Sequence, residues 1–132
     1  MSKGDIMVGI VIVSHSQKLA EGVVEISRMM AESAPIVAAG GLDDGTLGTS
    51  YGKICAAVEE VYSADGVIIL MDMGSAVMTT EMVLEDLKKP NVRMLDCPLV
   101  EGAVLAAVES AGGRSLEEIS ERIAEARTTK KF

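Results

Sequence analysis

The sequence is poor in aromatic residues. Among its 132 residues only Tyr51, Tyr62 and Phe132 carry an aromatic ring, and Trp does not occur. Proteins that bind single-stranded nucleic acid stack the bases on aromatic side chains, so this inventory argues against that class of function. Since hydrophobic residues still make up 48% of the chain, we expect an aliphatic core of Val, Ile, Leu, Ala and Met.

Positive charge is also in short supply. The chain has 12 Lys and Arg against 20 Asp and Glu, which gives a formal net charge of −8. A field of this sign repels the phosphate backbone of nucleic acids. We therefore expect protein partners and no nucleic acid.

Few residues can bind a metal ion or cross-link the chain. Cys55 and Cys97 lack CxxC spacing, and His15 is the only histidine. A metal site needs more ligands than these, so we expect no metal. Two isolated cysteines in an acidic chain are typical of a reduced, cytoplasmic protein.

The chain has no hydrophobic run of membrane-spanning length. The longest early run, residues 6–13, is too short to cross a bilayer, and no small-residue cleavage site follows it closely. The length of the chain fits about one domain. We predict no membrane association, a single soluble domain over residues 1–127, and a polar, frayed tail over residues 128–132.

Apolar strands alternate with amphipathic helices along the sequence. Apolar segments predict strands over residues 6–13, 35–39, 66–71 and 92–95. The first is continuously apolar and rich in β-branched residues, and the second is weaker because of its alanines. Apolar positions three and four residues apart predict helices around residues 19–30, 54–61, 75–87, 100–108 and 116–123. The fourth helix is expected to end at Gly112-Gly113, and Ser115 with Glu118 forms a capping box that opens the fifth.

The order of these elements, βαβαβαβαα, is typical of an α/β fold with a parallel sheet covered by helices on both faces. Right-handed crossovers on a chain of this size favour an open, mainly parallel four-stranded sheet in the flavodoxin-like order 2-1-3-4. Ligands bind at the carboxyl ends of the two strands that flank the switch point of such a sheet. Those strands are the first and the third, which are followed by His15 and Asp72.

His15 and Asp72 together can form a nucleophilic site. A carboxylate that accepts one ring N–H of His15 fixes the tautomer and leaves the other nitrogen as a nucleophile. The first helix begins beside His15, so its free N–H groups and the Ser16 hydroxyl can bind an anion. These parts suit a histidine that carries a phosphoryl group. The residues alone leave another interpretation open, in which His15 is structural and Asp72 only caps the next helix.

A Gly-rich segment over residues 40–50, GGLDDGTLGTS, follows the second strand and belongs to the same edge of the sheet. Its glycines would let the backbone approach a ligand or a partner closely, although a solvated turn explains it equally well. It is not a Walker A loop, because Gly52-Lys53 is followed by Ile54 rather than by Ser or Thr. We expect no bound nucleotide and no cofactor.

The predicted helix over residues 75–87 is apolar around more than one face. A helix of this kind is buried on two sides. It either forms a subunit interface or packs between the sheet and a neighbouring helix, and the sequence favours neither.

Three motifs occur in order at the expected strand ends: VSHS with Leu19-Ala20-Glu21-Gly22, AAGGLDDGTLGTS and MDMGSA. Together they resemble the DhaM family, the phosphotransferase subunits of phosphoenolpyruvate-dependent dihydroxyacetone kinases. That family is similar in fold to the mannose-family IIA domains of the sugar phosphotransferase system. The resemblance extends from the first strand to the last helix.

The resemblance implies a transient phosphohistidine at His15, formed by the histidine phosphocarrier protein after enzyme I has charged that protein from phosphoenolpyruvate. It implies that Asp72 orients the histidine. It also implies a homodimer that passes the phosphoryl group to ADP held on the DhaL subunit, where ATP then phosphorylates dihydroxyacetone on DhaK in glycerol metabolism. The candidates for hydrogen bonding to the phosphate oxygens are Ser16, Thr49, Gly74 and Ser75.

Two rival interpretations compete with this one. Mannose-type IIA domains serve sugar transporters and have Gly-Gly-Ser or Gly-Gly-Thr and then Pro after the aspartate, whereas this chain has Met73-Gly74-Ser75-Ala76 and fits the DhaM family better. The other rival is a non-catalytic binding module of flavodoxin-like fold. Some DhaM proteins carry additional phosphocarrier and enzyme I-like domains; since this sequence stops at Phe132, we expect separate proteins to supply its phosphate.

Overall fold

Four parallel strands form one sheet at the centre of the molecule. The computed structural model describes residues 6–132. The strands lie in the order β2-β1-β3-β4 and span β1 (Gly9–Ser14), β2 (Ile36–Gly40), β3 (Val67–Met71) and β4 (Val92–Met94). The predicted α/β class and the strand order 2-1-3-4 are confirmed.

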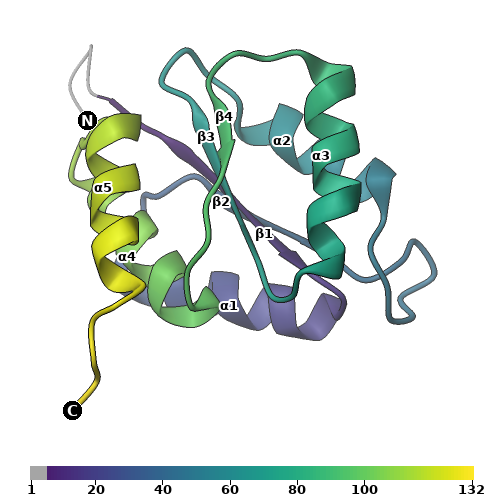
Figure 1. Ribbon diagram of the computed structural model, residues 1–132, viewed down its shortest axis with the longest axis horizontal. Helices are drawn as coiled ribbons and strands as arrows, with labels where there is room; N and C mark the ends of the chain where they lie inside the picture. The colour runs from purple at the N-terminus through teal and green to yellow at the C-terminus, as the bar shows by residue number, and fades with distance from the viewer. Residues whose placement is uncertain (1–5) are drawn as a thin grey trace.

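Five helices cover the two faces of the sheet (Figure 1). One face packs against α1 (Gln17–Met30), α4 (Leu99–Ala111) and α5 (Leu116–Ala126), and the other against α2 (Tyr51–Val61) and α3 (Ser75–Leu87). Successive strand residues face opposite sides, so Ile10 and Ile12 enter the first core while Val11 and Val13 enter the second. Both sets are fully buried, which explains why the strand reads as one continuous apolar run.

The local signals in the sequence start and end these helices. The Ser16 and Ser50 hydroxyls accept hydrogen bonds from backbone N–H groups in the first turns of α1 and α2. Both hydrogen bonds of the capping box between Ser115 and Glu118 are present at α5. Within residues 6–132, no helix combines the length and apolar content needed to cross a bilayer.

The first strand is shorter than its apolar run. Val8 is fully buried, yet strand pairing with β3 begins one residue later, at the partners Gly9 and Val67. Burial follows from apolar character, whereas a strand begins only where a neighbouring strand is available for pairing. At the other end of the chain, residues 128–132 are exposed and belong to no helix or strand, and Lys131 Nζ lies 2.7 Å from the Glu101 carboxylate of α4.

Helix α3 is buried on one side and exposed on another. Ala76, Thr80 and Val83 face the core, whereas Met78 and Met82 are 72% and 56% exposed. Packing between the sheet and a neighbouring helix does not account for these two methionines, because more than half of each residue is exposed in the described part of the chain.

Candidate active site

His15 and Asp72 meet at the carboxyl ends of two neighbouring strands. Val13 of β1 is paired with Met71 of β3, so the residues that follow them are brought together. Nδ1 of His15 lies 3.0 Å from Oδ1 of Asp72, and the two side chains are 23% and 12% exposed. The predicted imidazole–carboxylate pair is therefore formed.

The second oxygen of the Asp72 carboxylate is held by two donors. The Ser14 hydroxyl donates to Oδ2 at 2.8 Å and the His15 backbone N–H donates to the same oxygen at 3.0 Å. Partial burial alone would raise the pKa of Asp72, but these hydrogen bonds and the His15 ring lower it below its usual value. The carboxylate is thus ionised and accepts a hydrogen bond from Nδ1–H of His15.

This arrangement decides which ring nitrogen can react. A neutral imidazole with its proton on Nδ1 has a lone pair on Nε2. Nε2 lies 2.6 Å from the Ser75 hydroxyl, which donates to it from the first residue of α3. In this tautomer Nε2 is therefore the ring nitrogen whose lone pair is available for bonding.

The four predicted phosphate-binding residues are placed differently. Ser75 contacts the ring, and Gly74 precedes it with open space where a Cβ would be. The Ser16 hydroxyl accepts the Leu19 N–H at 3.1 Å as the cap of α1. The Thr49 hydroxyl lies 3.1 Å from the Thr79 hydroxyl on α3, which connects the Gly-rich loop to that helix.

The Gly-rich loop supports the histidine segment through its backbone. The Gly48 N–H donates to the His15 carbonyl at 2.8 Å, and the Gly41 N–H donates to the Ser14 carbonyl at 3.0 Å. At the end of β2, a Cβ on Gly40 would lie 2.5 Å from the Ser16 carbonyl oxygen, so only glycine permits this approach. The loop therefore does more than turn in solvent.

Sequence reasoning missed Ser14. This residue ends β1, is fully buried and binds the Asp72 carboxylate. The available signal was a single polar residue at the end of a strand that is otherwise apolar, directly before His15.

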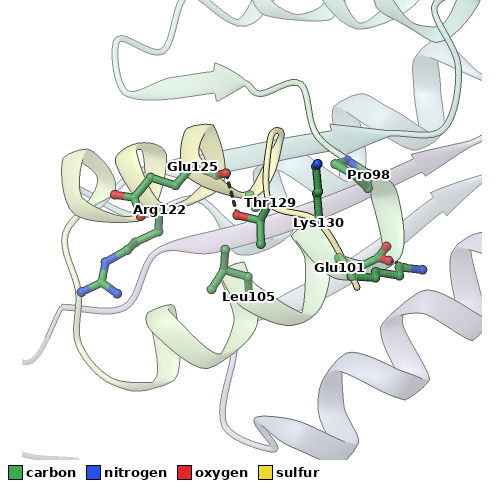
Figure 2. A pocket seen from close by; sticks show the side chains of 9 residues that line it. Pro98, Glu101, Leu105, Arg122, Glu125, Thr129 and Lys130 are labelled. Atoms are coloured by element: carbon green, nitrogen blue, oxygen red, sulfur yellow. Dashed lines mark hydrogen bonds and ion pairs between the residues drawn. The ribbon is translucent and has the colours of Figure 1, made fainter.

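Two cavities lie near the ends of the strands and helices. A cleft of about 440 Å³ opens beside Asp72, between the ends of β3 and β4, and is lined by Met73, Met94 and Cys97 among others. A second pocket, of about 400 Å³, lies between α4, α5 and the C-terminal tail, where the Thr129 hydroxyl donates to the Glu125 carbonyl (Figure 2). The second pocket contains none of the predicted site residues.

Comparison with known proteins places the chain in a family. A sequence model of the EIIA-man family, described as the fructose IIA component of the phosphotransferase system (PTS), matches residues 9–120. In Lactococcus lactis, the phosphotransferase subunit DhaM of a PTS-dependent dihydroxyacetone kinase is 37% identical over 115 residues, which cover 87% of this chain and 92% of that protein. In Escherichia coli, the phosphoryl donor subunit DhaM of a phosphoenolpyruvate-dependent dihydroxyacetone kinase is 42% identical over 120 residues, or 86% of this chain.

The Escherichia coli relative is much longer, and the matched part spans about a quarter of it (25%). Among solved structures, the mannose/sorbose-specific IIA subunit from Enterococcus faecalis superposes with a TM-score of 0.55 at 17% identity, over 96% of each chain, which shows a shared fold. The chain belongs to the EIIA-man family, and within it to the DhaM proteins.

Proposed function

We propose that this protein carries a phosphoryl group on Nε2 of His15, between the histidine phosphocarrier protein and ADP held on a DhaL subunit. One observation carries the proposal: Asp72 contacts Nδ1 of the ring, so that Nε2 lies on the exposed side of the ring at the carboxyl ends of the strands. The relatives named as subunits of dihydroxyacetone kinases support the proposal that the phosphoryl group is used for dihydroxyacetone phosphorylation.

The transfer is a substitution at phosphorus. The Nε2 lone pair attacks in line, the bond between phosphorus and the donor's nitrogen breaks, and the Nδ1 proton stays hydrogen-bonded to Asp72. A loose transition state of this kind requires mainly positioning and charge stabilisation. The ionised Asp72 carboxylate stabilises the positive charge that develops on the ring.

The start of α3 supplies donors for the transferred group. The Ser75 hydroxyl, which donates to Nε2 in the resting protein, rotates to donate to a phosphoryl oxygen. The first N–H groups of a helix have no acceptor within it and bind anions, which gives Gly74 and Ser75 a second role. All four phosphate-binding residues stay predictions. In the resting structure the Ser16 hydroxyl caps α1 and the Thr49 hydroxyl binds Thr79.

We further propose a cytoplasmic homodimer in which residues 1–127 act as one phosphotransfer domain; residues 1–5 lie outside the described part of the chain. The exposed Met78 and Met82 on α3 support a subunit interface there.

The test is phosphorylation with phosphoenolpyruvate, enzyme I and the phosphocarrier protein. His15 is the only histidine, so an acid-labile phosphate on this chain identifies it without mapping, and His15→Ala must abolish the signal. Transfer is then measured by adding a DhaL–ADP complex and assaying ATP. Absence of the phosphohistidine overturns the carrier proposal, whereas a phosphohistidine that yields no ATP overturns only the DhaL partner and favours a sugar transporter.

A further inference from the structure

Ser14 contacts both the Asp72 carboxylate and the backbone next to His15. It is the last residue of β1, and its side chain is fully buried. Its hydroxyl donates to Oδ2 of Asp72 at 2.8 Å and accepts the Ser16 N–H at 3.0 Å. A hydroxyl has one proton, and the N–H of Ser16 can only donate, so the proton of Ser14 must point to the carboxylate.

The consequence for Asp72 concerns its orientation. A carboxylate can rotate about its last side-chain bond, a torsion with a broad energy minimum. Two donors on Oδ2, one from Ser14 and one from the His15 backbone, hold that rotation so that Oδ1 faces Nδ1 of His15. Without the hydroxyl, Oδ2 would keep one donor, and the carboxylate could turn away from the ring.

The consequence for the histidine segment is equally direct. The hydrogen bond from the Ser16 N–H to the Ser14 hydroxyl fixes the turn between β1 and α1, in which His15 lies. Ser16 then caps α1. One buried hydroxyl therefore holds both the carboxylate and the backbone on which the imidazole is mounted.

We propose that Ser14 is a positioning residue, which orients the Asp72 carboxylate and through it keeps the proton of His15 on Nδ1, so that Nε2 is free to react. The effect on transfer rests on the proposed function of His15. The effect on the tautomer does not, because it is a property of the unphosphorylated protein.

The main variant is Ser14→Ala, and Ser110→Ala is its control. Ser110 is also a fully buried serine, and its hydroxyl donates to the Val8 carbonyl at 2.6 Å, away from Asp72. Ser110→Ala loses the hydrogen bond to the Val8 carbonyl of the segment that leads into β1, whereas Ser14→Ala loses two, one to Asp72 and one from the Ser16 N–H. Only Ser14→Ala therefore loses a contact with the site. Ser14→Thr, which keeps the hydroxyl, is the rescue variant.

The first readout is the ¹⁵N NMR spectrum of the ring in alkaline solution, where one histidine gives one pair of signals. We expect the Nδ1–H tautomer to dominate in the wild type, Ser14→Thr and Ser110→Ala, and its fraction to fall in Ser14→Ala. The second readout is the initial rate of phosphorylation, which should fall about tenfold in Ser14→Ala, the scale of one lost hydrogen bond to a charged group.

If the fraction of the Nδ1–H tautomer in Ser14→Ala equals that of the wild type, the inference is overturned. It is also overturned if this fraction falls equally in Ser110→Ala, because that result would reflect a general loss of stability. If Ser14→Ala does not fold, Ser14→Cys takes its place with the same expectations, since a thiol is a weak donor of similar size. If the wild type accepts no phosphate, the proposed function fails while the tautomer measurement still decides the role of Ser14.

Discussion

Gly48 of the Gly-rich loop donates its backbone N–H to the carbonyl of His15 at 2.8 Å. The loop thus holds the backbone of the histidine segment directly after the end of β1. Gly48 has a φ of +146°, and a Cβ on it would lie 2.8 Å from Cγ of Leu42. The positive φ therefore favours glycine, and a Cβ would in addition displace the Leu42 side chain.

Replacing this glycine should loosen the histidine segment. We expect Gly48→Ala to lower the free energy of unfolding by about 1–3 kcal/mol, because of the strained backbone and the contact with Leu42. We also expect slower phosphorylation of His15. Urea unfolding measures the stability, and initial rates measure the phosphorylation. If Gly48→Ala is as stable as the wild type, the loop adapts to the added Cβ and the expectation is wrong.

Gly22 provides a matched glycine for comparison. It lies inside α1, and a Cβ there would meet nothing within 4 Å. Alanine has the higher helix propensity, so Gly22→Ala should raise the free energy of unfolding by about 0.5–1 kcal/mol. Destabilisation on urea unfolding would contradict this and would point to a partner contact on α1.

The charge of Asp72 should matter for transfer. Asp72→Asn keeps the size but offers no negative charge to the ring, so we expect the initial rate of His15 phosphorylation to fall about a hundredfold or more. The control is Asp96→Asn, since Asp96 is an exposed carboxylate paired with Arg127. If both variants are phosphorylated at rates within about a factor of two of the wild-type rate, the Asp72 carboxylate does not act on His15.

The same carboxylate should make the stability depend on acid. The pKa of Asp72 is lower in the folded protein than in the unfolded chain, where an aspartate has a pKa of about 3.9. The stabilising contribution is therefore fully present well above the unfolded pKa and is lost as the pH falls through the folded pKa. We expect the difference in free energy of unfolding between wild type and Asp72→Asn to shrink on acidification. Urea titrations at a series of pH values measure this difference. A difference that stays constant would contradict the coupling between the ionisation of Asp72 and stability.

Two buried serines should respond in opposite ways to alanine. The Ser27 hydroxyl on α1 has no hydrogen-bond partner among the described residues, whereas that of Ser110 binds the Val8 carbonyl. Removing an unsatisfied hydroxyl relieves a desolvation cost, so Ser27→Ala should stabilise the protein by about 1 kcal/mol, while Ser110→Ala should destabilise it by about 1–3 kcal/mol. Thermal and urea unfolding compare the two, and loss of stability in Ser27→Ala would indicate a bound water.

Local patterns in the sequence were sufficient to predict the class of fold. Apolar runs marked β1 and β3 most clearly, whereas Arg93 interrupts the short β4. The limits predicted for the third helix are those of α3, Ser75–Leu87. These features depend on neighbours in sequence, which is why they can be read there. Strand ends depend on pairing with distant segments, and β1 therefore begins later than its apolar run.

The sequence also determined that His15, the single histidine, follows a buried strand, and the strand order predicted that Asp72 stands beside it. What only the tertiary structure decided is which atoms meet. The buried Ser14 hydroxyl and the backbone of His15 bind one oxygen of Asp72, and the other oxygen faces Nδ1. Residues 58 positions apart make the contact between Ser14 and Asp72, so no local pattern in the sequence contains it.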